Sequence, residues 1–315
     1  MFEKHKKEAF SAYKKAWNVL CKHGLIKEFT DEARALEKFY QENKKLTRKL
    51  EEKWGDYGEF TIFGDYYKAL VVIAYAKAID EGREKPTEDD VNWAHRFIMG
   101  TVVKEIPKIF LEGEELEAYY ILFVRKHILG GTIPDVILFI TNKRVLYWNR
   151  NIFAKLSSPF APSKVSIPLN EDERVTRVCG IYKPSAGPTA KFMAILTNKR
   201  LIGVEIYENE FGYDQVSLRG GEEIITQLTR YPNFLFLTTE KLVFFHPEYS
   251  ITGPKIKTAV FDRGDKSVKA EIQEKRGFLG GLRLVIRKEK PIIEIRLTTD
   301  EELNAGKEIE RIFHL

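Results

Sequence analysis

Apolar and charged positions along residues 1–110 alternate with the three-and-four spacing of amphipathic helices. The first predicted helix presents one apolar face, formed by Phe10, Tyr13, Ala16, Trp17 and Leu20, and Gly24 is placed to end it. Three more helices are predicted over about 30–54, 64–81 and 87–106. Thr30 and Thr87 are suited to cap the second and the fourth, because a threonine hydroxyl can accept a hydrogen bond from the first turn. The pattern therefore predicts an N-terminal helical bundle.

After Pro107 the pattern changes to short β-branched and aromatic runs separated by Gly, Pro, Asn and Asp. The runs that predict strands are 118–124, 136–140, 145–148, 165–167, 174–181, 192–196 and 201–206, with further runs beyond. Residues 300–313 return to helical spacing. We expect the apolar members of this last helix to close the open end of a barrel; they are Leu303, Ile309, Ile312 and Phe313. The predicted fold class is α+β.

The β-rich part contains a sequence repeat. Gly113-Glu114-Glu115 and Gly221-Glu222-Glu223 each precede an apolar run that ends in a threonine-led turn, Thr141-Asn-Lys-Arg144 in one copy and Thr238-Thr-Glu-Lys241 in the other. The hairpin sequence at 194–206 also resembles that at 284–295. We therefore predict one β module built twice, over 111–218 and 219–315, after a helical domain at 1–110. The first copy shows no closing helix at 207–218.

This order of elements resembles the PH-like superfold, and in particular the bacterial PH and GRAM-type families. The resemblance rests on the Gly-Glu-Glu opener, the Thr-Asn-Lys-Arg hairpin, the further strands and the terminal amphipathic helix, and it covers roughly 200 residues in two copies. It implies a bent seven-stranded sandwich closed by one helix. Members of these families bind lipid headgroups, peptides or partner proteins, and few are catalytic.

The helical part is similar to the lid that follows the ATPase core of minichromosome maintenance helicases. The similarity is carried by the segments at 29–40, 67–77 and 86–94, and the match as a whole covers about 70 residues. The chain departs from that family in two ways. It contains no Gly-x-x-x-x-Gly-Lys-Ser/Thr phosphate loop, and the position of the nucleotide-sensing arginine falls near the acidic Asp65. The resemblance therefore implies a docking or DNA-proximal module without ATP hydrolysis.

Composition adds few constraints. The formal net charge of +5 comes from 51 Lys and Arg against 46 Asp and Glu, which permits a basic patch but does not demand a nucleic-acid partner. Two distant cysteines, Cys21 and Cys179, encode no disulfide framework. The charged N-terminus and the absence of a long apolar stretch predict a cytoplasmic protein. Abundant Lys and Glu with three Met would suit a thermophile.

Candidate binding residues are cations. Lys143, Arg144, Lys199 and Arg200 stand on predicted turns, where they could bind phosphates or serve as ordinary turn residues. A second set, for nucleic acid, is Lys44, Lys45, Arg48 and Lys49, although Glu51 and Glu52 follow directly and favour a salt-linked surface. No histidine has a partner at zinc-binding spacing and no nucleophile motif is present, so we predict no metal, no cofactor and no catalytic residue.

These observations favour a non-catalytic adaptor that binds a protein partner through its helical domain and PH-like modules. One alternative is a DNA-associated protein of an archaeal replication or mobile-element system, for example of a plasmid or virus. Another is a peripheral lipid-binding protein that uses Lys143 and Arg144.

Overall fold

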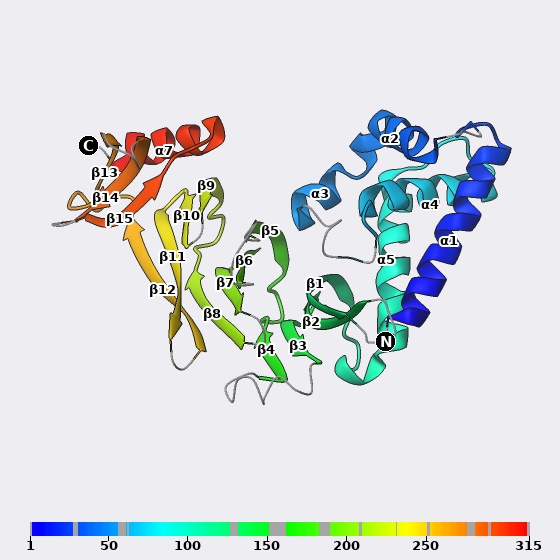
Figure 1. The fold of residues 1–315 in the computed structure, drawn as a ribbon, viewed down its shortest axis with the longest axis horizontal. Coiled ribbons are helices and arrows are strands. Elements are labelled where there is room, and N and C mark those ends of the chain that lie inside the picture. Colours follow the sequence, from blue (N-terminus) through cyan, green and yellow to red (C-terminus); the bar gives the residue numbers. More distant parts are fainter. Residues whose placement is uncertain are drawn as a thin grey trace. The chain divides into compact units, whose positions relative to one another are not determined.

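The fold is α+β, as the hydrophobic pattern predicts, and Figure 1 shows the order of its elements. The structure is a computed structural model that describes residues 2–27, 31–55, 61, 63–126, 132–150, 162–182, 190–207, 210–230, 232–250, 253–275, 281–288 and 291–313. The helices are α1 (Glu3–Lys22), α2 (Glu32–Asn43), η1 (Lys44–Leu46), α3 (Arg48–Trp54), α4 (Tyr66–Asp80), α5 (Glu88–Glu105), η3 (Pro107–Ile109) and α7 (Asp300–Phe313).

The strands of the described residues form four antiparallel sheets. The first sheet is β1 (Leu116–Lys126), β2 (Thr132–Thr141), β3 (Arg144–Asn149) and β4 (Lys164–Pro168). The second is β5 (Val175–Tyr182), β6 (Ala190–Thr197), β7 (Arg200–Tyr207) and β8 (Glu210–Ser217). The third is β9 (Ile224–Arg230), β10 (Asn233–Thr238), β11 (Lys241–Ser250) and β12 (Gly253–Asp262). The fourth is β13 (Lys269–Lys275), β14 (Gly281–Arg287) and β15 (Pro291–Arg296). In every sheet, strands that are neighbours in sequence are also neighbours in space.

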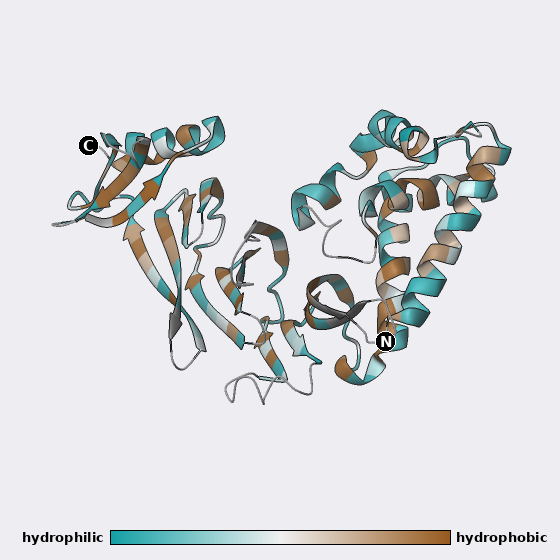
Figure 2. Cartoon of the chain, viewed as in Figure 1, coloured by the Kyte–Doolittle hydropathy of each residue, from teal (hydrophilic) through white to brown (hydrophobic). Residues whose placement is uncertain are grey.

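The helical region is organised around α4, whose apolar residues are buried almost throughout its length. Figure 2 shows α4 largely in brown, whereas α2 is mostly teal. α1, α2 and α5 pack on α4. Thr87 is the N-cap residue of α5, as predicted, and it forms a capping box with Asp90, whose carboxylate accepts from the Thr87 backbone N–H at 2.8 Å. α2 is capped by Asp31, whose side chain accepts from the Arg34 N–H, while the predicted cap Thr30 lies outside the described residues.

Buried histidines connect the helices to the first sheet. His5 of α1 contacts Thr101 of α5 through Nδ1 at 2.5 Å and Tyr119 of β1 through Nε2 at 2.9 Å. The Thr101 hydroxyl donates to the Ile98 carbonyl, so its oxygen accepts from His5, and Tyr119 donates to the other ring nitrogen. Burial lowers the pKa of His5 to about 4, so the ring is neutral near neutral pH.

His95 of α5 repeats this connection at a second point. Its Nε2 donates to the carbonyl of Glu117 in β1 at 2.7 Å, and its Nδ1 accepts from the Tyr66 hydroxyl at 2.8 Å. Burial lowers the pKa of His95 to about 4, against a smaller opposing effect of the Glu117 carbonyl. Helices α1 to α5 and the first sheet consequently form one compact unit.

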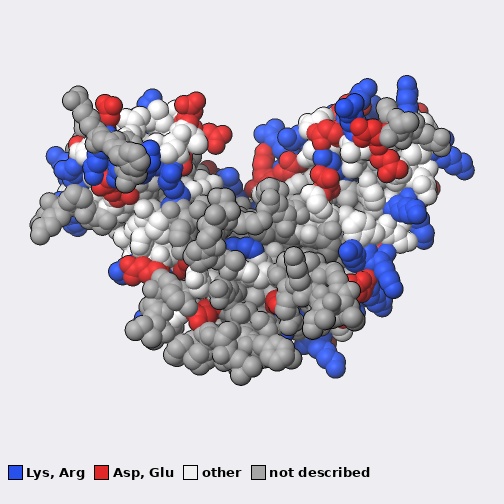
Figure 3. All heavy atoms as spheres, in the orientation of Figure 1, with Lys and Arg blue, Asp and Glu red and all other residues white. Residues whose placement is uncertain are grey.

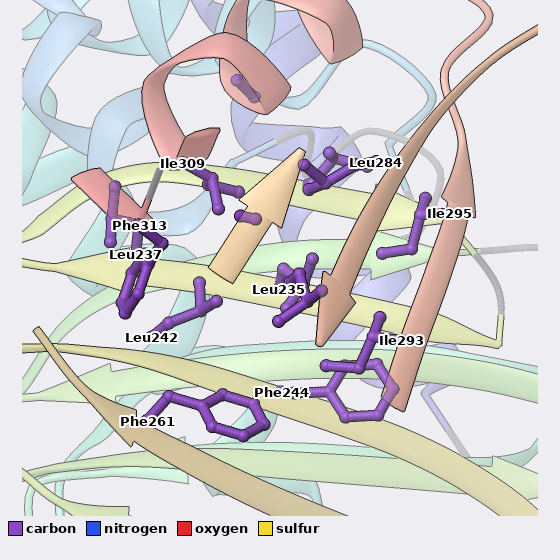
Figure 4. Packing of buried hydrophobic residues seen from close by; sticks show 14 of the residues in the cluster. Leu235, Leu237, Leu242, Phe244, Phe261, Leu284, Ile293, Ile295, Ile309 and Phe313 are labelled. Carbon is purple, nitrogen blue, oxygen red and sulfur yellow. The ribbon is translucent and has the colours of Figure 1, made fainter. Parts of the chain in front are cut away.

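A second compact unit runs from Val178 onward. The third and fourth sheets and α7 enclose one core, in which the apolar side chains of β10, β11 and β12 meet those of β14, β15 and α7 (Figure 4). Ile309 and Phe313 of α7 are buried there, and Leu303 and Ile312 pack against the same core. The predicted helix at 300–313 and the burial of its apolar face are confirmed. The other face of the third sheet packs on the second sheet through Phe192, Phe234 and Phe245.

Contacts thus divide the chain into two units, whereas the sequence predicts three domains with boundaries near 110 and 218. Those domain boundaries stay a prediction. Residues 1–110 pack directly against the strand that follows them, because both buried histidines form hydrogen bonds to β1.

Candidate functional site

The threonine of the first predicted basic turn is a buried hydrogen-bonding centre. The Thr141 hydroxyl oxygen accepts from the backbone N–H groups of Lys143 at 3.2 Å and Arg144 at 3.0 Å, and the hydroxyl contacts the Glu114 carboxylate at 2.7 Å. Thr141 is fully buried and joins the ends of β2 and β3. We call this arrangement a threonine turn. It explains the sequence motif, because a short hydroxyl is needed to satisfy two turn N–H groups away from water.

Arg144 is the cation of this turn, and it is held by Glu114 of the Gly-Glu-Glu opener. Its Nε donates to Oε1 at 2.8 Å and its Nη2 donates to Oε2 at 2.9 Å, while Nη2 also donates to the Ile109 carbonyl at 2.8 Å. The Glu114 side chain is 0% exposed and that of Arg144 is 9% exposed. Burial acts to raise the pKa of Glu114, but the hydrogen bonds from Arg144, Leu111 and Thr141 outweigh it, and the pKa is lowered. Arg144 is therefore committed to a structural pair.

The same turn occurs twice more, at the starts of β7 and β11. Thr197 accepts from the N–H groups of Lys199 at 3.1 Å and Arg200 at 2.9 Å. Thr238 accepts from the N–H groups of Glu240 at 3.2 Å and Lys241 at 2.9 Å. Each of the first three sheets therefore has its own threonine turn between its second and third strands.

The acidic partner recurs with the turn. Glu222 of the second Gly-Glu-Glu opener accepts from Thr238 at 2.5 Å and lies 3.3 Å from the Lys241 ammonium, so it repeats the role of Glu114. In all three sheets a buried carboxylate caps the turn that precedes the first strand. Glu114 accepts from Leu111 N–H at 2.6 Å, Glu173 from Asn170 N–H at 3.1 Å and Glu222 from Arg219 N–H at 2.8 Å.

The other candidate cations of the turns are distributed between the two units. The Lys143 ammonium donates to the Glu112 carbonyl at 2.7 Å and its side chain is exposed. Arg200 donates to Gln215 at 2.5 Å, and Lys199 is half-buried. Lys143 belongs to the first unit, whereas Lys199 and Arg200 belong to the second. The four candidate cations of the turns therefore do not all belong to one unit.

The candidate nucleic-acid set lies on η1 and the start of α3. Arg48 forms an ion pair with Glu52 at 2.7 Å, and Glu52 is one of the two glutamates that directly follow this set in the sequence. Lys49 forms an ion pair with Glu88 of α5 at 2.5 Å. Lys44 and Lys45 are exposed, and no ion pair to them is formed by the described residues. Two of the four cations are therefore neutralised by partners on the surface.

A groove on the helical region was not foreseen from the sequence. It has a volume of about 940 Å³, and one wall is the aromatic row Phe10, Tyr13 and Trp17 of α1. The facing wall comes from the first turns of α2, with Glu32, Ala33 and Leu36, and from Asp65 at the start of α4. Cavities of this size are typical of sites that hold a ligand or a segment of a partner.

The apolar face predicted for α1 is buried only in part, because Ala16 and Leu20 are buried whereas the three aromatic residues of that face are not. The buried positions of α1 are His5, Ala9, Ala16 and Leu20. Phe10 and Trp17 each follow a buried alanine by one residue, which turns them by about 100° around the helix. Phe10 is 38% exposed, and Trp17 is half-buried. The alanines permit close packing of α1 on α4 and α5, and the larger rings are left at the edge of that contact.

Acidic groups surround the tyrosine in the middle of the row. Burial, followed by the negative charges of Glu32 and Asp65, raises the pKa of Tyr13 to about 12. The phenol is therefore a protonated hydrogen-bond donor across the physiological range. To find this groove from the sequence, one would need to know which face of α1 is buried. That face is set by small alanines, which are buried in place of the larger aromatic side chains.

Comparison with known protein families, curated proteins and solved structures finds no match to this chain. In the described residues, no group of three His, Cys, Asp or Glu side chains is placed to hold a metal ion. None of the helices in the described part of the chain combines the length and the apolar content that crossing a bilayer requires.

Proposed function

We propose that the chain is a non-catalytic adaptor that binds a protein partner through its helical region and its β modules. The observation that carries the proposal is the groove on α1, because it leaves three neighbouring aromatic rings partly open to solvent. Aromatic side chains supply the anchors of protein interfaces, and a folded monomer gains more by burying them than by lining a groove with them.

The reactive side chains support a non-catalytic role, since the buried ones are used in internal contacts. Glu114 pairs with Arg144, and Asp90 accepts from Arg83 at 2.7 Å and from Lys77 at 2.8 Å. His5 and His95 are neutral and hydrogen-bonded on both ring nitrogens. Each of these groups stabilises the fold, and none points into the groove.

A PH-like identity for the second module is part of the proposal. Its support is the order of elements from β9 to α7, in which a four-stranded meander, a three-stranded meander and a helix share one core. This order agrees with the seven strands and one helix that the resemblance implies. The first module differs, because the second sheet has four strands and no helix lies between β8 and β9.

Affinity capture from the native host tests the proposal. The full chain, immobilised through a C-terminal tag, is expected to retain one protein in near-stoichiometric amount, and gel filtration of the mixed purified proteins should give one co-eluting complex. A heat-unfolded sample of the chain serves as the control bait. Retention of nothing beyond the control, together with turnover of a small molecule by the purified chain, would rule out a non-catalytic adaptor.

A second candidate, a DNA-associated protein, is favoured by the charge of α1. Lys7, Lys14, Lys15 and Lys22 have no ion-pair partner among the described residues, and Figure 3 shows blue cationic side chains along the side of the helical region that α1 forms. An electrophoretic shift over a salt series discriminates the two candidates. DNA binding should weaken steeply as salt rises, because bound cations release counterions from the phosphates. A chain that shifts no DNA at low salt would remove this candidate.

A further inference from the structure

The α1 groove combines an apolar wall with polar groups of both signs. Lys14, Lys27 and Glu32 line it, and all three side chains are exposed. None of the described residues forms an ion pair with these three side chains. Asp65, at the same wall, is already paired with Lys68 at 3.0 Å. The groove therefore offers one acidic and two basic side chains to an occupant, beside a row of aromatic faces.

This mixture of charges indicates which class of molecule could bind in the groove. A nucleic acid carries a negative charge at every phosphate, and Glu32 with Asp65 would repel it inside the groove. A membrane surface is flat and cannot enter a hollow lined by charged groups. A peptide can carry an apolar anchor, a basic residue and acidic residues in one short stretch, so its charges can match all of these positions.

We propose that the α1 groove binds a short peptide segment of the protein partner. One aromatic or leucine side chain of that segment packs on Tyr13 and Trp17, a basic residue pairs with Glu32, and acidic residues pair with Lys14 and Lys27. The Tyr13 hydroxyl, which stays protonated, donates a hydrogen bond to a backbone carbonyl of the peptide. This inference rests on the proposed adaptor function, since it names the part of the partner that is recognised.

The size of the groove agrees with this occupant. At about 940 Å³ it is larger than a single side chain requires and has room for several residues of a peptide. The aromatic rings line it over two turns of α1, from Phe10 to Trp17. Such a row fits a segment that lies along the helix, with its anchor near the middle.

The test uses dodecapeptides displayed on phage and selected on the immobilised full-length chain. Selected sequences are expected to share an aromatic or leucine anchor with a basic residue on one side and acidic residues on the other. A synthetic fluorescent copy of the best sequence then reports affinity by anisotropy. Trp17→Ala should weaken binding about 30-fold, as expected for an aromatic anchor contact, and Trp17→Phe should retain most of it.

Trp93→Ala provides the matched control, because Trp93 is also partly exposed, at 39%, but lies on α5 outside the groove. Its binding should equal that of the wild type. Glu32→Lys should reverse the charge preference, so that a peptide with its basic residue changed to glutamate binds the variant better than the original peptide does. Recovery by this paired exchange cannot arise from a folding defect.

Cys21 reports occupancy independently, because it lines the groove and is partly exposed whereas Cys179 is buried. Bound peptide should slow the alkylation of Cys21 by N-ethylmaleimide. The inference is overturned if no peptide is selected, if selected peptides bind Trp17→Ala as tightly as the wild type, or if they leave Cys21 alkylation unchanged. It is also overturned if oligo(dT) displaces the peptide and itself depends on Trp17.

Failure of this inference is distinguishable from failure of the adaptor function. A partner captured equally by the wild type and by Trp17→Ala would leave the adaptor function in place and move the interface away from the groove. If no partner is captured from the host but specific peptides are still selected on the groove, the adaptor function loses its support whereas the peptide site remains.

Discussion

Replacing Glu114 by leucine tests whether the threonine turn holds the first sheet together. The substitution leaves the Arg144 guanidinium buried, with three donors directed at an apolar side chain and at one remaining carbonyl. Removing one partner of a buried ion pair costs about 3–5 kcal/mol, because the other charge stays out of water without compensation. The Glu114 side chain is 0% exposed, so solvent does not screen the loss. We expect the free energy of unfolding to fall by that amount.

Urea denaturation followed by circular dichroism measures the effect, and the chain supplies its own control. Glu115, the next residue of the same motif, is exposed, and Glu115→Gln should change the free energy of unfolding by no more than about 0.5 kcal/mol. The double variant Glu114→Leu with Arg144→Met should recover most of the loss, since both charges are then absent. Equal small effects of the changes at 114 and 115 would refute the assignment of Glu114 to a buried pair.

Three further variants test other parts of the fold. Because burial lowers the folded pKa of His5 from 6.5 to about 4, its contribution is complete above pH 6.5 and is lost as the pH falls toward 4; His5→Gln should remove about 3 kcal/mol of that loss in urea titrations across this range. Gly212→Ala places a Cβ 2.5 Å from the Pro254 backbone oxygen and should cost about 1–3 kcal/mol, whereas Gly220→Ala meets nothing and should be tolerated in the same thermal scans. Ile309→Ala should cost about 2–5 kcal/mol by emptying part of the core under α7, and a change below this range would contradict its burial.

The elements that sequence predicted best are those whose signal is local. The helix at 300–313 was placed correctly, because acidic residues begin it and its apolar positions recur at helical spacing. The hairpin at Thr141 was located for the same reason, since its turn residues and flanking strands are contiguous. Such features need no knowledge of distant parts of the chain.

The features that sequence missed depend on contacts between distant residues. The choice of the buried face of α1 was decided by Ala9 and Ala16, which fit against α4 and α5, and not by the more hydrophobic rings beside them. The bond between His5 and Tyr119 spans 114 residues, and no local pattern marks it. For the same reason, the groove could not be proposed until the orientation of α1 was known.

The threonine turns also explain why a repeated motif carries little information about ligands. In each turn the hydroxyl receives the same two backbone N–H groups, so Thr141, Thr197 and Thr238 perform one invariant task. The cation three residues later is used inside the fold. Arg144 is buried against Glu114, and Arg200 reaches across to the neighbouring strand.

Lys241, the third of these cations, lies near Glu222 and donates to the Ser217 carbonyl at 2.8 Å. A ligand site that had been duplicated would preserve the geometry of its charges and tolerate changes in the turn. Here the turn is preserved, and in two copies its cation pairs with the buried glutamate of the Gly-Glu-Glu opener, which is the pattern of a structural element. The partner recognition that we propose is then expected at a surface that occurs once, and the groove on α1 meets that condition in the described residues.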